Sequence, residues 1–198
     1  MPQVDYFLAL QSPYVYLAGT RPAEIAARHG ATLVYKPLDT GQLFPRTGGK
    51  PRAERHPSRN AYSTRDRARQ ARKLGMKLDD QPMFGGANPA PAAYALIAAQ
   101  AAGGGDLAGF VAAIGRALWA EGRDISDDEV IHAALSAHGF DPKAADRGMM
   151  MAADTYAANL EEAVARGAFG VTSFLVGDEM FWGQDRLEDL DLYLAGKL

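Results

Sequence analysis

A serine stands where the first predicted helix begins, and its hydroxyl is the first group along the chain that could do chemistry. Ser12 is followed by Pro13, a pair typical of a helix start, because the hydroxyl can accept a hydrogen bond and proline lacks the N–H that would go unpaired there. A helix N-terminus carries about half a positive charge and free N–H groups, so it favours an anion. Ser12 is therefore a helix cap, an anion-binding group, or both.

The composition of the chain limits the kinds of reaction in which this serine can take part. The chain of 198 residues has no cysteine, which excludes a disulfide scaffold, a thiolate metal site, a cysteine nucleophile and a redox Cys-x-x-Cys pair. Any sulfur chemistry would need sulfur from another molecule. The four histidines show no metal-ligand spacing, so we expect no metal. With 21 Lys and Arg against 24 Asp and Glu there is no basic excess, and we expect no nucleic-acid partner.

Hydropathy places the chain among globular proteins. No stretch approaches the roughly 18 consecutive apolar residues of a membrane span, and the first residues lack the basic region and cleavage site of a signal peptide. We therefore expect a cytoplasmic protein with no membrane partner. A hydrophobic content of 47% in 198 residues is enough for one domain with a core of its own, or for a domain with a sub-domain.

Periodicity predicts strands at both ends of the chain and helices between them. A strand at 4–10, a helix at 13–29 and a strand at 31–37 form a right-handed βαβ unit, so the two strands should be parallel. Glycines and prolines between 38 and 58 predict a long loop. The remaining expected helices are 62–74, 91–102, 107–122, 127–138 with a capping box at Ser126 to Glu129, a stretch from 141 or 142, and about 146–166.

The pattern returns to strands near the C-terminus. A strand at 172–176, a turn at 177–178 and a strand at 179–182 predict a hairpin, and a helix follows at 183–194. The order β-α-β, helices, β-β-α is that of an α/β thioredoxin-like domain split by an all-helical domain. We expect residues 1–38 and 168–198 to form the thioredoxin-like domain and 39–167 the inserted helical domain.

Four segments carry a resemblance to a known family. Tyr6 to Ala18, Thr47 to Pro51, Gly122 to Ser126 and above all Phe169 to Leu187 resemble the 2-hydroxychromene-2-carboxylate isomerases. These are relatives of the kappa-class glutathione transferases in the DsbA-like branch of the thioredoxin superfamily. The likeness runs nearly end to end, in the same order. It implies an enzyme that is a homodimer and uses glutathione as its bound source of sulfur.

The resemblance gives Ser12 a catalytic role. Ser12, Pro13 and Tyr14 take the place of the Cys-x-x-Cys of thioredoxin relatives, so exchange of protein thiols and disulfides is excluded. A glutathione thiolate that accepts a hydrogen bond from the Ser12 hydroxyl would have its pKa lowered from about 8.5. By resemblance, Ser12 both binds and activates the glutathione sulfur.

Two C-terminal segments are implied to hold the rest of glutathione. The turn from Gly183 resembles the family's Gly-x-Asp-Arg turn, which here supplies Gln184, Asp185 and Arg186. Asp185 can accept from the α-ammonium group, and backbone N–H groups of the turn can receive the α-carboxylate. The alternative is a helix cap at Asp185 with Arg186 in a surface ion pair.

The second segment is the strand edge before the hairpin. The backbone of Val171 would pair with the cysteinyl unit of glutathione, and Thr172 stands where thioredoxin relatives carry a cis-proline. Either the peptide bond between them is trans and the loop differs, or it is a cis bond without proline, which costs about 3–4 kcal/mol.

Basic and aromatic residues of the middle segment complete the implied site. Arg59 takes the place of a family lysine and could bind a carboxylate through two hydrogen bonds, while Gly49 stands where the family has asparagine. Lys50, Tyr14 and Tyr62 are candidate contacts to an aromatic carboxylate substrate. Taken singly, such bases are more often solvated surface charges, and such aromatics more often pack in the core.

The activity implied is isomerisation of 2-hydroxychromene-2-carboxylate or a related aromatic ring-cleavage product. A thiolate adds reversibly to a conjugated carbon, the resulting single bond rotates, and elimination returns glutathione. Two alternatives stay open: a kappa-class-like glutathione transferase or peroxidase, and a thioredoxin-fold binding module without catalysis.

Overall fold

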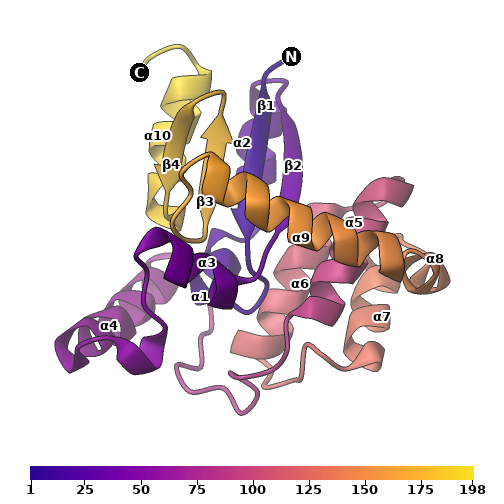
Figure 1. Ribbon diagram of the computed structural model, residues 1–198, viewed down its shortest axis with the longest axis horizontal. Coiled ribbons are helices and arrows are strands. Elements are labelled where there is room, and N and C mark those ends of the chain that lie inside the picture. The colour runs from indigo at the N-terminus through magenta and orange to yellow at the C-terminus, as the bar shows by residue number, and fades with distance from the viewer.

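The protein is built on one mixed sheet of four strands, β1 (Gln3–Leu8), β2 (Thr32–Pro37), β3 (Ser173–Val176) and β4 (Glu179–Trp182). The computed structural model describes residues 1–198, apart from the side chains of Ala144 and Ala145. The strand order is β2-β1-β3-β4 (Figure 1). β1 pairs parallel with β2, whereas β3 pairs antiparallel with both β1 and β4. The predicted βαβ unit and C-terminal hairpin are confirmed.

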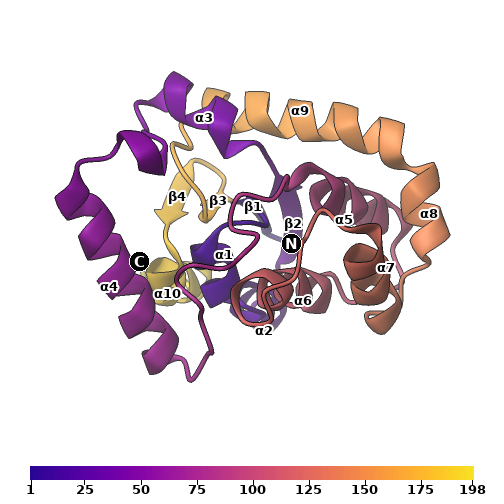
Figure 2. The same ribbon diagram turned by 90° about the horizontal axis from the view of Figure 1, so that it is seen from below.

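Helices cover both faces of this sheet (Figure 2). On one face lie α1 (Pro13–Ala18), α2 (Arg21–Arg28) and α10 (Leu187–Leu194), and on the other lies α9 (Met149–Ala165). Alternation along β1 sends its side chains to the two faces in turn, as expected for a strand covered on both sides. Tyr6 and Leu8 join the larger core with α10, and Phe7 joins a second core under α9.

All the remaining helices lie between β2 and β3 in the sequence, so the thioredoxin-like fold with a helical insertion is confirmed. α9 belongs to both parts, because it packs along α5 and also lies over the sheet. The domain boundaries at 38 and 168 stay a prediction. The other helices are α3 (Thr40–Thr47), the 3-10 turn η1 (Arg52–Glu54), α4 (Pro57–Lys73), α5 (Ala90–Ala102), α6 (Leu107–Trp119), α7 (Asp128–Ala137) and α8 (Pro142–Arg147).

The single helix predicted at 13–29 is wrong, because the chain turns between α1 and α2. Gly19 has a φ of +56°, a conformation that glycine adopts at little cost and other residues avoid. Pro22 falls in the first turn of α2, where its missing N–H leaves no bond unmade. The helix that begins after Ser12 therefore has only six residues.

The long loop predicted at 38–58 is also wrong, since it holds α3, η1 and the start of α4. Asp39 caps α3 by accepting a hydrogen bond from the Gly41 N–H at 2.7 Å, and Gly48, with a φ of +78°, ends it. α4 begins at Pro57, five residues before the predicted start.

Two other helix starts differ from prediction. The cap of α7 is Asp127 rather than Ser126, because Asp127 accepts from the Glu129 N–H while the Ser126 hydroxyl donates to Asp124 at 2.7 Å. The last helix opens as a 3-10 turn, η2 (Gln184–Arg186), before α10. In the described part of the chain, no helix is both long and apolar enough to cross a membrane.

An ion-pair cluster joins the sheet to α9. Asp5 on β1 is buried and accepts from Arg166 at 2.6 Å, with the Lys36 ammonium 3.5 Å away. Burial opposes ionisation, but the hydrogen bonds from Arg166 and Gln3 and the charge of Lys36 outweigh it, so the pKa of Asp5 lies below its usual value.

Asp5→Asn is expected to lower the free energy of unfolding by about 2 kcal/mol at pH 7. A carboxylate whose pKa is lowered on folding stabilises the fold above its unfolded pKa of about 3.9 and loses that contribution as the pH falls through the folded value. The deficit of the variant should therefore shrink between pH 5 and pH 2, as measured by urea unfolding. Asp178→Asn, at the exposed turn between β3 and β4, is the matched control. A deficit that stays constant over this pH range would contradict the assignment.

Candidate functional site

The sheet topology brings three predicted segments to one end of the sheet, where β1 and β4 end and β3 begins; this end is called the site edge, or simply the edge. β1 ends four residues before Ser12, and β3, antiparallel to β1, begins just after Thr172. β4 runs back to the same edge, where the Gly183 N–H donates to the Thr172 carbonyl oxygen at 2.9 Å. α1 also contacts η2. Residues 12, 171–172 and 183–186, far apart in the sequence, therefore lie at one end of the sheet.

The Ser12 hydroxyl is available at this edge. Its backbone carbonyl accepts from the N–H groups of Val15 and Tyr16, both at 3.1 Å, so Ser12 occupies the cap position of α1. Its side chain, however, makes no capping hydrogen bond, and the residue is half-buried. Because α1 is short, the helix contributes a smaller dipole than the predicted 13–29 helix would. The hydroxyl itself is thus the principal group with which Ser12 can stabilise an anion.

Buried oxygens without partners belong to the residue before Ser12 and to the residue before β3. The Oγ1 atom of Thr172 and the Oε1 atom of Gln11 are two of four buried side-chain polar atoms that lack a hydrogen-bond partner among the described residues. The peptide bond between Val171 and Thr172 is cis, which decides between the two predicted alternatives. Buried polar groups are nearly always paired, so these oxygens favour a bound polar molecule at the edge.

The turn after β4 is shaped by a close approach of backbone and carboxylate. Gly183 has a φ of +118°, a conformation that other residues rarely adopt, so the turn needs glycine, and Oδ1 of Asp185 lies over the space where a Cβ would stand. The side chains of Asp185 and Arg186 are each about half exposed and 3.4 Å apart, a weak pair that leaves both accessible. The predicted surface pair is present, and Asp185 remains free to accept from a ligand.

Gln184 has a structural partner that the sequence does not reveal. It is buried, and its Oε1 accepts from Nη2 of Arg21 at 2.6 Å. The same guanidinium donates to the carbonyl oxygens of Leu17 and Ala18, so Arg21 joins η2 to the end of α1. The Gln184 side-chain oxygen is therefore occupied by Arg21. The ligand contact predicted for Gln184 would have to be made by its backbone.

Tyr14 links this edge to α4. Its hydroxyl donates to Asp66 on α4 at 3.2 Å, and burial together with the Asp66 carboxylate raises the pKa of Tyr14 to about 12. The side chain is thus neutral at pH 7 and holds α4 against α1. The candidate Tyr62 is 63% exposed and has the Arg69 guanidinium 5.3 Å from its ring centre, so it lies on the solvent side of α4.

α4 is also fixed by a buried arginine. Arg67 is 5% exposed and donates from Nε to Oδ1 of Asp80 at 2.9 Å, and a second nitrogen bonds to the same carboxylate and to Thr64. Asp80 belongs to the segment between α4 and α5. This pair attaches α4 to the chain that follows it.

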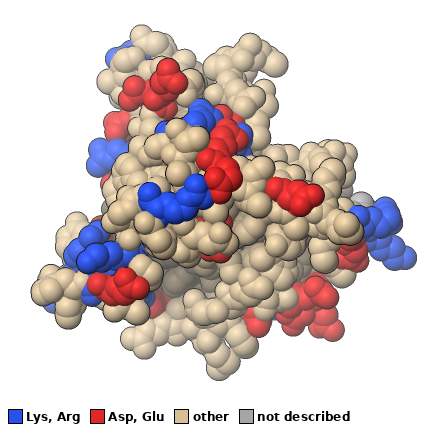
Figure 3. Space-filling model, in the orientation of Figure 1, with Lys and Arg blue, Asp and Glu red and all other residues tan. Residues whose placement is uncertain are grey.

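Basic charge gathers on this part of the molecule. Residues 46–77 hold 11 of the chain's 21 Lys and Arg and only 2 of its 24 Asp and Glu. Figure 3 shows a group of these basic side chains over α4. Arg59 and Lys50, predicted from the resemblance, lie here and are exposed. The net charge of −3 for the whole chain conceals this basic segment, which a count of charged residues along the sequence could have found.

Arg55 is a candidate that sequence reasoning missed. It is half-buried, its Nε donates to the Lys50 carbonyl oxygen at 2.7 Å, and its guanidinium lies 5.7 Å from the centre of the Phe44 ring. Burial and the nearby Arg59 lower its pKa, whereas Tyr14 acts in the opposite direction. Arg55 thus lies among other cations and near the tyrosine that follows Ser12.

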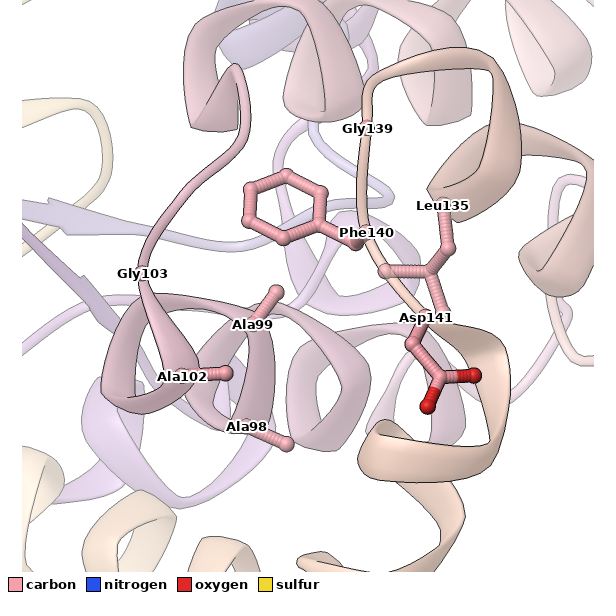
Figure 4. Close-up of a pocket in the computed structure, with 8 residues that line it drawn as sticks. All are labelled: Ala98, Ala99, Ala102, Gly103, Leu135, Gly139, Phe140 and Asp141. Carbon is pink, nitrogen blue, oxygen red and sulfur yellow. The ribbon is translucent and has the colours of Figure 1, made fainter.

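Two hollows lie in the helical part, apart from these residues. One, of about 240 Å³, is lined by alanines, glycines, Leu135, Phe140 and the Asp141 carboxylate (Figure 4). The other, of about 460 Å³, lies between α3, α5 and α9 and includes Tyr94 and Tyr156. Neither is lined by a predicted site residue, so the edge of the sheet remains the candidate site.

Comparison with known proteins agrees with this architecture. The model of the DsbA-like thioredoxin domain matches residues 3–195. A 2-hydroxychromene-2-carboxylate isomerase from Sphingobium xenophagum is 28% identical over 195 residues, which cover 96% of this chain and 97% of that protein. The protein of the same name from Pseudomonas putida is 30% identical over 190 residues, covering 93% and 90%.

Solved structures with the same fold include an isomerase of the same name. The structure of a 2-hydroxychromene-2-carboxylate isomerase superposes with a TM-score of 0.79 at 26% identity, over 98% of this chain and 95% of that one. The cytosolic disulfide reductase DsbM from Pseudomonas aeruginosa, solved with GSH, shares the fold with a TM-score of 0.68 at 20% identity, over 98% of each chain. The end-to-end match, with serine where a disulfide reductase needs cysteine, places this chain in the DsbA-like thioredoxin family and, within it, among the 2-hydroxychromene-2-carboxylate isomerases.

Proposed function

We propose that this protein is a glutathione-dependent isomerase of 2-hydroxychromene-2-carboxylate or a related aromatic ring-cleavage product. The observation that carries the proposal is the Ser12 hydroxyl, which makes no capping bond and lies at the same edge as the buried, unpartnered Oγ1 of Thr172. A chain without cysteine needs sulfur from elsewhere, and the two curated relatives are named as isomerases of this substrate.

The residues at the edge suit the parts of glutathione. The backbone of Val171 and the Thr172 side chain would hold the cysteinyl unit, while Asp185 and the N–H groups of η2 would hold the γ-glutamyl end. Arg59 would bind the glycyl carboxylate or the substrate. When bound, glutathione would supply a thiolate that adds reversibly to the substrate and so allows a double bond to rotate.

Ser12 would keep that sulfur ionised near neutral pH. A hydroxyl that donates a hydrogen bond to the charged form of a thiol lowers its pKa. Tyr14 does not compete for this role, because its own proton is held by Asp66. The basic residues around Arg55 and Arg59 would attract the substrate carboxylate and stabilise negative charge that develops on the substrate.

A mass balance of glutathione tests the proposal. With 2-hydroxychromene-2-carboxylate and a small amount of glutathione, we expect many turnovers to trans-o-hydroxybenzylidenepyruvate, no loss of free thiol, and no catalysis when glutathione is omitted. Product is followed by absorbance and thiol by titration. Glutathione consumed in step with a chloronitrobenzene would instead identify a transferase. A protein that binds no glutathione by calorimetry would be the binding module, and the proposal would fall.

A further inference from the structure

Three guanidinium groups that lie close to one another lack a carboxylate partner. Arg52, Arg55 and Arg59 make no ion pair within 4.0 Å in the part of the chain that the structure describes, although Glu54 lies between the first two in sequence. Arg67, the other arginine close to Arg55, is already paired with Asp80. A local excess of positive charge in a half-buried place is stabilised by a bound anion.

Among the three, Arg55 is the one whose position is fixed. Its Nε–H donates to the Lys50 carbonyl oxygen, and its guanidinium carbon lies over the Phe44 ring, 5.7 Å from the ring centre. In the described structure neither of its two terminal nitrogens makes a hydrogen bond. Arg52 and Arg59 are exposed. Because an ordered, partly desolvated guanidinium loses little freedom on binding, Arg55 is the better carboxylate ligand.

Gly49 explains how Phe44 comes to support Arg55. A Cβ on residue 49 would lie 2.5 Å from Cδ1 of Phe44, so the ring occupies the space that a side chain at 49 would need. By resemblance, the family has an asparagine side chain at position 49. In this protein the Phe44 ring fills that space, and Arg55 lies over the ring. The substitution at 49 and the position of Arg55 are parts of one arrangement.

We propose that Phe44 and Arg55 form the carboxylate-binding subsite for the aromatic substrate, with Arg55, rather than Lys50 or Arg59, donating to the carboxylate from its two free terminal nitrogens. Phe44 and the Lys50 carbonyl oxygen hold the guanidinium in place, and the subsite selects an aromatic acid over its neutral amide. The inference rests on the proposed function for the identity of the substrate. Its test measures binding without turnover.

The test compares cinnamate, a stable aromatic carboxylate, with cinnamamide, its uncharged counterpart, by calorimetry on the full-length protein. Arg55→Met should raise the Kd for cinnamate about 10- to 100-fold, the range expected for a lost charge-assisted hydrogen bond, and leave the weak binding of cinnamamide unchanged. Arg55→Lys should fall between, because lysine keeps the charge but not the fork. In turnover, Arg55→Met should raise KM far more than it lowers kcat.

Two further variants separate the subsite from general charge. Arg65→Met removes the same charge from the exposed face of α4 and should change the cinnamate Kd less than about twofold. Gly49→Ala alters no charge but displaces the Phe44 ring, and it should weaken cinnamate binding severalfold.

Each outcome bears on the inference. An unchanged cinnamate Kd in Arg55→Met, equal losses in Arg65→Met, or wild-type protein that does not prefer cinnamate to cinnamamide would overturn it. A protein without isomerase activity whose cinnamate binding still depends on Arg55 would refute the proposed function while supporting the subsite.

Discussion

Ser12→Ala is expected to lower kcat about 100-fold while changing the Kd for glutathione less than threefold. The hydroxyl is one of several contacts that would hold glutathione, but it is the one proposed to donate to the sulfur, and its side chain makes no capping bond that would compete. Its loss therefore acts on the reactive ionised form much more than on binding. Steady-state kinetics and calorimetry measure the two effects separately.

The same substitution should raise the pKa of the bound thiol. A hydrogen bond from a hydroxyl to a thiolate is worth about 1.5–3 kcal/mol, which corresponds to about one to two pH units. Thiolate absorbance in the ultraviolet should therefore appear at higher pH in the complex of the variant than in that of the wild type. At any pH between the two values, the variant holds less thiolate and is slower.

Two variants control for the serine substitution. Ser12→Thr keeps the hydroxyl and should retain most of the activity. Ser136→Ala removes an exposed hydroxyl from α7 and should change nothing. Equal losses of kcat and glutathione affinity in Ser12→Ala, or none in either, would mean that Ser12 is only a helix cap.

Asp80→Ala is expected to lower the free energy of unfolding by about 3 kcal/mol, the largest stability effect that we predict for a polar residue. Its carboxylate is the ion-pair partner of Arg67, which is 5% exposed, so truncation leaves a guanidinium buried without a counter-charge. Urea unfolding should show a lower midpoint with an unchanged slope.

A double variant distinguishes the pair from ordinary packing. Arg67→Met with Asp80→Ala removes both charges and should be more stable than Asp80→Ala alone, because no charge is then buried unpaired. Asp154→Ala, an exposed carboxylate on α9, supplies the control for loss of an aspartate from the surface. If Asp80→Ala is as stable as Asp154→Ala, the buried pair contributes nothing.

Local signals account for the elements that the sequence predicts well. The hairpin of β3 and β4 follows from β-branched and aromatic residues on both sides of Gly177 and Asp178, all within ten residues. The helix predicted at 13–29 failed for a different reason. The prediction followed the apolar spacing and gave too little weight to Gly19 and Pro22, the residues at which the chain turns between α1 and α2.

The site divides in the same way. Ser12 and Asp185 could be placed because each stands at the end of an element and in a segment that resembles the family. Arg21 and Arg55 could not, since their roles depend on partners chosen by the tertiary fold: Gln184 lies 163 residues from Arg21, and Phe44 supports Arg55 across an unforeseen helix. Spacing along the chain contains no record of either contact.

The strand order has a consequence for the time course of folding. β1 lies in the interior of the sheet, and one of its two neighbours is β3. The hydrogen bonds between β1 and β3, where Phe7 lies opposite Ser173, can form only after β3 has been made. Contacts between such distant segments form slowly, because a long loop must close before they are rewarded. During synthesis, β1, β2 and the helices between β2 and β3 are made first, while β1 still presents an unpaired side that can pair with other chains. The C-terminal segment from Val171 thus both supplies residues of the proposed site and, through β3, covers the unpaired side of β1, which is the part of the sheet most exposed to aggregation.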